Sequence, residues 1–103
     1  MPSMRTLKHP EPDAFTLDRV LYALSDPVRM EIVRHLAGVT EATCGELCGE
    51  RPKSSASHHF RVLRDSGLVQ TRNVGTTHMN SLRSEELETR FPGLLAAILR
   101  QLG

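Results

Sequence analysis

The stretch Lys53–Val69, KSSASHHFRVLRDSGLV, decides the fold and raises the first question about function. On a helical wheel, Ala56, Phe60 and Leu63 fall on one face, which predicts a helix held in the core through that side. Gly67 follows the last turn, and glycine is the residue that most often ends a helix. The stretch therefore predicts one helix with its polar residues facing outward.

The outward face of this helix combines small polar side chains with basic ones. Ser57, Arg61 and Arg64 share the side opposite the core residues, and His58 lies beside them. Small residues let a helix end approach phosphates closely, while Ser and His can reach base edges and Arg can bind the DNA backbone. The pattern is typical of a recognition helix that enters a major groove.

A second, short helix is predicted immediately before this one. In TCGELC, Thr43 is followed three residues later by Glu46, which is the spacing of a capping box. Pro52 then interrupts the helical pattern, and we expect Ser54 or Ser55 to cap the next helix. Two helices joined by a tight break are the outline of a helix-turn-helix.

Two further helices are predicted near the N-terminus. The first follows Asp13, and the second begins at Asp26-Pro27, a capping residue followed by a proline at the first helical position, and stops at Gly38. The apolar positions at helical spacing are Leu17, Val20, Leu21 and Leu24 in the first, and Val28, Ile32, Val33 and Leu36 in the second.

The periodicity changes after Gly67. LVQTR and THMNSL are strand-like runs joined by NVGT, which predicts a two-stranded hairpin. Ser84 is expected to cap a last helix that Pro92 kinks or restarts. The apolar stripe beyond this proline consists of Leu94, Leu95, Ile98, Leu99 and Leu102. The predicted fold is mainly α with a small β-hairpin, in the order ααααββα, which is the plan of a winged helix-turn-helix.

Charge is distributed unevenly along the 103 residues, although the net charge is only +1. Residues 51–83 carry six basic residues against Asp65 alone, a net charge of +5, and the remainder carries −4. Such a basic half suggests a surface that faces a polyanion. With four aromatic residues and no tryptophan, a stacking platform for single-stranded nucleic acid is not expected.

We expect one domain, residues 13–103, preceded by a flexible N-terminal arm, residues 1–12. A chain of this length suits a single core. It contains no run of about 18 apolar residues and no signal-peptide-like apolar segment, so the expected location is the cytoplasm and no membrane contact is expected.

Two stretches of the sequence together resemble the ArsR/SmtB family of winged-helix transcriptional repressors. They are ALSDPVRMEIVRHLAG and SSASHHFRVLRDSGLV. The resemblance runs from Leu17 through the wing to Leu82, and FPGLLAAIL resembles the family's dimerising last helix. It implies a homodimer that binds a palindromic double-stranded DNA operator and is released by an inducer.

The resemblance also implies the roles of individual residues. Ser55, Ser57 and His58 would face bases, residues 72–78 would form the wing over the adjacent minor groove, and His59 would support the helix. The expected DNA contacts are Lys53, Ser54, Ser55, Ser57, His58, Arg61, Arg64, Arg72, Thr76, Thr77 and His78. The expected dimer interface consists of Leu17, Leu21, Leu94, Leu95, Ile98, Leu99 and Leu102.

Cys44 and Cys48 are the candidate sensor residues, because they lie one turn apart on the short helix. Their spacing to the adjacent histidines does not suit a zinc finger, and TCGELC departs from the C-x-C metal box of the resembled family. Three interpretations stay open: buried apolar-like cysteines, a site for a soft metal ion or metalloid that His9 or a second subunit would complete, and a redox switch. No cofactor and no particular metal is specified.

No enzymatic activity is expected, since the serines and histidines lack an aligned base and an orienting carboxylate. The alternative interpretation of the same fold is a winged-helix module for protein contact, or a DNA-binding regulator whose sensing is done by a partner protein. A small inducer is the other candidate partner.

Overall fold

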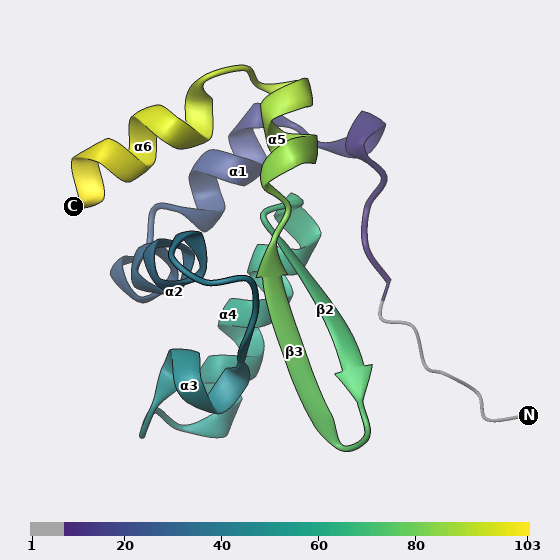
Figure 1. The fold of residues 1–103 in the computed structure, drawn as a ribbon, viewed down its shortest axis with the longest axis vertical. Coiled ribbons are helices and arrows are strands. Elements are labelled where there is room, and N and C mark those ends of the chain that lie inside the picture. The colour runs from purple at the N-terminus through teal and green to yellow at the C-terminus, as the bar shows by residue number, and fades with distance from the viewer. Residues whose placement is uncertain (1–7) are drawn as a thin grey trace, which may run out of the picture.

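The computed structural model of the chain describes residues 8–103, so residues 1–7 of the expected arm lie outside the described residues (Figure 1). Helices surround one end of a small sheet whose hairpin extends from the body. The elements are a 3-10 turn at Pro12–Ala14, α1 (Leu17–Ala23), α2 (Pro27–Ala37), β1 (Ala42–Thr43), α3 (Cys44–Cys48), α4 (Lys53–Ser66), β2 (Val69–Val74), β3 (Thr77–Leu82), α5 (Ser84–Arg90) and α6 (Leu94–Leu102).

Local sequence signals set several helix ends as predicted. The Asp26 carboxylate accepts the backbone N–H groups of Val28 and Arg29 at 2.8 and 3.2 Å, so it caps α2. Thr43 and Glu46 form the predicted capping box of α3. Gly67 ends α4 in the left-handed region, at φ 92°.

The expected cap of α4 is wrong. Pro52, not Ser54 or Ser55, is the capping residue, and no side chain caps this helix end. The carbonyl of Pro52 accepts the Ala56 N–H at 3.0 Å, and its ring fixes a backbone angle that suits the residue before a helix. Both serines therefore lie inside the first turn, with their hydroxyl groups exposed.

The last helix is divided, and its start differs from the prediction. Arg83 precedes the helix and its carbonyl accepts the Leu87 N–H at 3.0 Å, so Ser84 is the first helical residue and not the cap. Around Pro92 the chain leaves the helical conformation and then continues as α6, which confirms the predicted restart.

The sheet has three antiparallel strands in the order β1-β3-β2, one more than the predicted hairpin. The hairpin is confirmed, with Val69 opposite Leu82 at its base and Val74 opposite Thr77 next to the turn. The added strand is two residues long and places Ala42 opposite Asn80. It ties the start of α3 to the wing.

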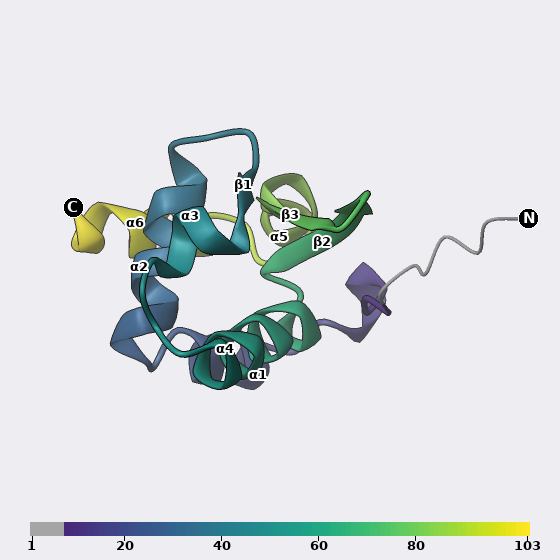
Figure 2. The same ribbon diagram turned by 90° about the horizontal axis from the view of Figure 1, so that it is seen from below.

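Buried side chains of α1, α2, α3, α4 and β2 form most of the core. Figure 2 shows how α2 faces α1 and α4, with the sheet beside them. Val28 is only half-buried, unlike the other three members of the predicted α2 stripe. The fully buried large side chains are Phe15, Val20, Ile32, Val33, Leu36, Leu63, Leu68, Val69 and Asn80. No helix between residues 8 and 103 has both the length and the apolar character needed to cross a bilayer.

Residues 8–12, expected to belong to a flexible arm, are attached to the sheet. His9 Nε2 accepts the backbone N–H of Thr71 on β2 at 2.9 Å. Arg83 donates to the Pro10 carbonyl at 2.8 Å and stacks over the Phe15 ring at 4.8 Å. The segment therefore covers the free edge of β2 and leads directly into the core.

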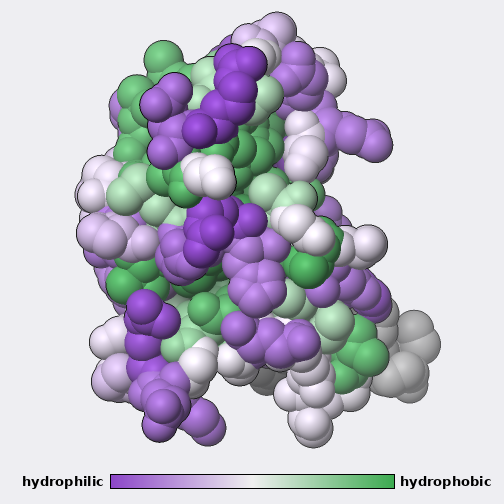
Figure 3. Space-filling model, turned by 60° about the vertical axis from the view of Figure 1, so that its left-hand side comes forward, coloured by the Kyte–Doolittle hydropathy of each residue, from purple (hydrophilic) through white to green (hydrophobic). Residues whose placement is uncertain are grey.

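The surface of α1 and α6 is rich in apolar side chains. No residue of α6 is buried, although Leu94, Leu95, Ile98 and Leu99 pack partly against the core. Leu17 and Leu21 on α1 are 46% and 48% exposed. In Figure 3 much of the upper half of the molecule, where these two helices lie in Figure 1, has a hydrophobic surface.

Candidate nucleic-acid interface

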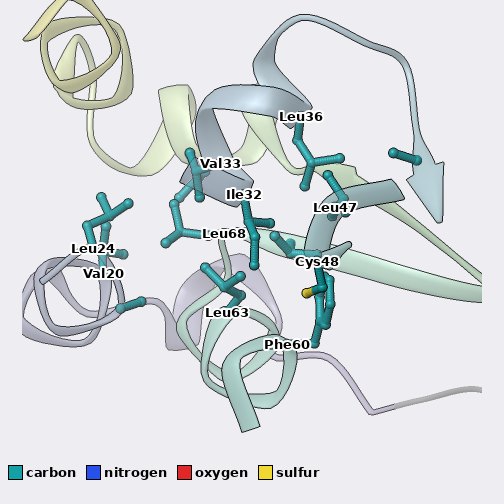
Figure 4. Close-up of a cluster of buried hydrophobic side chains, with 14 of the residues drawn as sticks. Val20, Leu24, Ile32, Val33, Leu36, Leu47, Cys48, Phe60, Leu63 and Leu68 are labelled. Atoms are coloured by element: carbon teal, nitrogen blue, oxygen red, sulfur yellow. The ribbon is translucent and has the colours of Figure 1, made fainter. Parts of the chain in front are cut away.

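Helix α4 is fixed to the body through its apolar side. Phe60 and Leu63 are buried, and they point from α4 toward the side chains of α2 and α3 (Figure 4). Ala56 is half-buried and packs against the same cluster. Figure 2 shows α4 lying against α1, with its N-terminal half at the surface of the molecule. This arrangement confirms the predicted core face.

The opposite side of α4 is open to solvent. Because α4 is a regular helix of 14 residues, its exposed polar side chains lie together along one surface. No acidic residue occurs between Lys53 and Arg64. The exposed residues of α4 are Lys53, Ser54, Ser55, Ser57, His58, Arg61 and, in the last turn, Asp65.

A groove of about 400 Å³ separates α4 from the tip of the hairpin. Arg64 was expected on the outward face, but it is half-buried here. Burial lowers the pKa of its guanidinium, which nevertheless stays charged at neutral pH. The groove is lined by Cys44, Lys53, Ala56, Ser57, Phe60, Arg64, Thr76 and His78. The structure thus brings predicted helix and wing residues to a single groove.

The wing residues are exposed, and one of them is engaged in an ion pair. Thr76, Thr77 and His78 are open to solvent at the end of the hairpin. Arg72 on β2 donates from Nε and Nη2 to the two carboxylate oxygens of Glu41, at 3.1 and 2.5 Å. This hydrogen-bonded pair raises the pKa of Arg72, so the guanidinium is charged and held against Glu41.

His59 faces inward, unlike His58. Its Nδ1 atom lies 3.1 Å from Nη1 of Arg29, a side chain that is only 4% exposed. The contact agrees with the expected supporting role of His59. Sequence reasoning missed Arg29, because an arginine within an amphipathic helix is ordinarily assigned to the solvent side.

The two cysteines have different environments. Cys48 is buried in the core, where burial raises the pKa of its thiol. Cys44 is half-buried at the groove, and its sulfur accepts a hydrogen bond from Asn80 Nδ2 at 3.4 Å. Among residues 8–103, no three His, Cys, Asp or Glu side chains are grouped as metal ligands. His9, the suggested additional ligand, binds Thr71 on β2.

Comparison with known proteins agrees with this geometry. A family described as a helix-turn-helix domain matches residues 24–72. The chain is 39% identical to an HTH-type transcriptional regulator of Bacillus subtilis, YceK, over 78% of this chain and 83% of that protein. It is 38% identical to the arsenical resistance operon repressor of Staphylococcus xylosus, over 70% of each.

A solved structure extends the agreement to the whole fold. The crystal structure of an ArsR family transcriptional regulator superimposes with a TM-score of 0.65 at 25% identity, over 92% of this chain and 96% of that one. The sequence matches and the fold agree with the helix-turn-helix and hairpin described above. The chain therefore belongs to the ArsR/SmtB family of DNA-binding winged helix-turn-helix transcriptional regulators.

Proposed function

We propose that this chain is a homodimeric repressor that binds a palindromic operator in the cytoplasm. In each subunit α4 enters a major groove, and the hairpin lies over the adjacent minor groove. The observation that carries this proposal is the exposed surface of α4, which has serines at its N-terminal end and basic residues along its length, with no acidic residue from Lys53 to Arg64. The proposal assigns the chain no enzymatic activity.

The proposed contacts divide by chemistry. Ser55, Ser57 and His58 reach base edges, because their short polar side chains lie on the leading turns of the helix. Arg61 and Arg64, which lie further along the helix, bind phosphates. The remaining proposed contacts are Lys53 and Ser54 at the helix start and Arg72, Thr76, Thr77 and His78 on the wing.

Dimerisation through α1 and α6 is supported by their unburied apolar residues. Two-fold symmetry would place two copies of α4 about 34 Å apart, one turn of DNA. The proposed interface comprises Leu17, Leu21, Leu94, Leu95, Ile98, Leu99 and Leu102, all of them exposed or half-buried in the single chain.

The proposed signal input is Cys44. Its thiol lines the groove between α4 and the wing. A soft metal ion or a metalloid bound to it, or its oxidation by peroxide to a sulfenic acid with release of water, would therefore change the space between the two proposed DNA-contacting elements. Cys48 is buried, so we assign it to the core and not to sensing. The test measures the operator affinity of wild type, Cys44→Ser and Cys48→Ser, with As(III) and with peroxide. A response retained in Cys44→Ser would contradict the assignment of Cys44 as the signal input.

The experiment that tests DNA recognition begins with a duplex selected by the wild-type protein from a randomised pool. Fluorescence anisotropy should show saturable binding whose logarithm falls linearly with the logarithm of salt concentration, because phosphate contacts release counterions. Failure to select any duplex, with a folded dimer in the binding buffer, would contradict the proposal and favour a protein-contact module.

A further inference from the structure

One buried guanidinium joins three helices. Arg29 on α2 donates from Nε to the Ala23 carbonyl at 2.7 Å and from Nη2 to the Tyr22 carbonyl at 3.4 Å, so it occupies the C-terminal end of α1. Its Nη1 atom lies 3.1 Å from Nδ1 of His59 on α4. The same guanidinium stacks over the Tyr22 ring at 5.3 Å. Nothing in the proposed DNA contacts requires this residue.

The chemistry of the contact fixes the protonation state of His59. An arginine side chain only donates hydrogen bonds, so Nδ1 must accept, and the ring must be neutral with its proton on Nε2. A proton added to Nδ1 would set two donors against each other and place a second positive charge beside Arg29. The contact can therefore exist only while His59 is uncharged.

We propose that Arg29 and His59 are positioning residues for operator binding. They hold the recognition helix α4 against α1, the helix assigned to the dimer interface. Protonation of His59 breaks their contact and releases α4. This inference rests on the proposed function, because it assumes that α4 reads DNA and that α1 joins the subunits. His59 neighbours His58, a proposed base contact, and Phe60, an anchor of α4 in the core. Loss of the Arg29 contact would therefore directly change the position of residues at the proposed DNA-binding surface of α4.

The charged and titratable groups that face His59 come from α2 and its capping residue, from the segment before α4 and from α4 itself. Burial of the ring, the largest effect, lowers the pKa of His59 below its ordinary value. Asp26 raises this pKa, while Arg29, His58 and Arg51 lower it. The contact is thus intact above pH of about 6.5, the ordinary histidine value, and is lost as pH falls through the lower pKa of the folded state.

Two other histidines, His58 and His78, are exposed at the proposed DNA surface. The test therefore compares two proteins that share both of these residues and differ only at position 59.

The test is the ratio of Kd values of wild type and His59→Asn for the selected duplex, from pH 8 to pH 5 at constant ionic strength. Asparagine places its carbonyl oxygen near the position of Nδ1 and accepts from Arg29 at every pH. We expect a ratio near one at pH 8 that rises as the pH falls toward 5, up to about tenfold, which corresponds to the loss of a hydrogen bond to a charged group. A ratio that does not change with pH, while both proteins bind, would overturn the proposal.

A second measurement uses the wild-type protein and depends on no variant. Nitrogen and carbon chemical shifts of the His59 ring should report the Nε2–H tautomer at pH 8, and the Nδ1–H tautomer would overturn the proposal even if His59→Asn failed to fold. Failure to select a duplex with wild type leaves this readout intact and counts against the proposed function instead. The two failures are therefore distinguishable.

Discussion

Arg72 on the wing and Glu41 before β1 form a two-point ion pair across the sheet, with Nη2 2.5 Å from Oε1. Arg72 belongs to the proposed minor-groove contacts, so it must exchange a carboxylate for a phosphate when DNA binds. The pair is partly exposed, with side chains 56% and 28% accessible, and such pairs are weak in water. Glu41 holds the wing arginine in place, and under the proposed function it competes with phosphate for Arg72 and is expected to lower operator affinity slightly.

Replacing Glu41 with Gln should tighten operator binding about three-fold and steepen the salt dependence by up to one unit, because Arg72 is then free to neutralise a phosphate. The measurement is an anisotropy titration between 50 and 200 mM salt. Glu31→Gln is the matched control, since Glu31 pairs with Arg34 on the exposed side of α2. Equal affinities for Glu41→Gln and wild type would show that Arg72 does not reach DNA.

Arg61→Ala should weaken binding to every duplex and reduce the salt slope by about one, as expected for a single phosphate contact. Arg61 is exposed on α4. Arg90→Ala, an exposed arginine on α5, serves as the control. A loss confined to one DNA sequence would count against a phosphate role.

Ser57→Ala and His58→Ala should change base preference more than overall affinity, because each side chain is proposed to reach a base edge. Each substitution should cost about 1–3 kcal/mol on the selected duplex and less on a scrambled one. The measurement is a second selection from the randomised pool with each variant. Recovery of the wild-type sequence at unchanged stringency would exclude these two residues from base recognition.

Leu21→Glu should produce a monomer that has lost high-affinity operator binding. Leu21 is 48% exposed on α1, so the substitution removes apolar area from the proposed interface without entering the core. Sedimentation equilibrium and anisotropy should change together. Val39→Glu, at a 42% exposed position between α2 and β1, is the control that should leave the dimer intact. A dimeric Leu21→Glu protein would place the interface elsewhere.

Gly67→Ala should destabilise the fold strongly. At φ 92° an L-residue is strained by about 1–2 kcal/mol, and a Cβ atom would also lie 2.4 Å from the Phe15 ring. Gly93→Ala is the matched control, because Gly93 has nearly the same backbone conformation, φ 80° and ψ −11°, with open space around it, and so isolates the strain alone. Thermal unfolding should show a clearly larger loss for Gly67→Ala, and equal losses would mean that Phe15 moves aside without cost.

Local signals predicted most of the helical framework. Asp26-Pro27, the Thr43–Glu46 box and Gly67 each act within one turn of the chain, so their effect is readable without tertiary contacts. The assigned cap of α4 failed because Pro52 already supplies the conformation of a capping residue, which leaves the following serines inside the helix. The prediction of the helix itself was not affected by this error, because its core face was inferred from the apolar periodicity.

The features that escaped prediction depend on distant partners. Strand β1 is too short to show alternation, and only its pairing with Asn80 defines it. Arg29 and Arg83 are buried because they bind carbonyls of Ala23 and Pro10, six and 73 positions away. A pattern that assigns charged residues to solvent cannot identify such groups. The contact between Arg29 and the recognition helix is of this kind.

The most direct test of the central claim is footprinting of the selected duplex with dimethyl sulfate, which reports the N7 atoms of guanines in the major groove, together with hydroxyl radicals, which report the backbone. The account predicts two protected major-groove patches separated by about one turn of DNA, 10–10.5 base pairs, with wing protection in the adjacent minor grooves. A single protected patch, or protection of the backbone with every N7 atom still reactive, would contradict it.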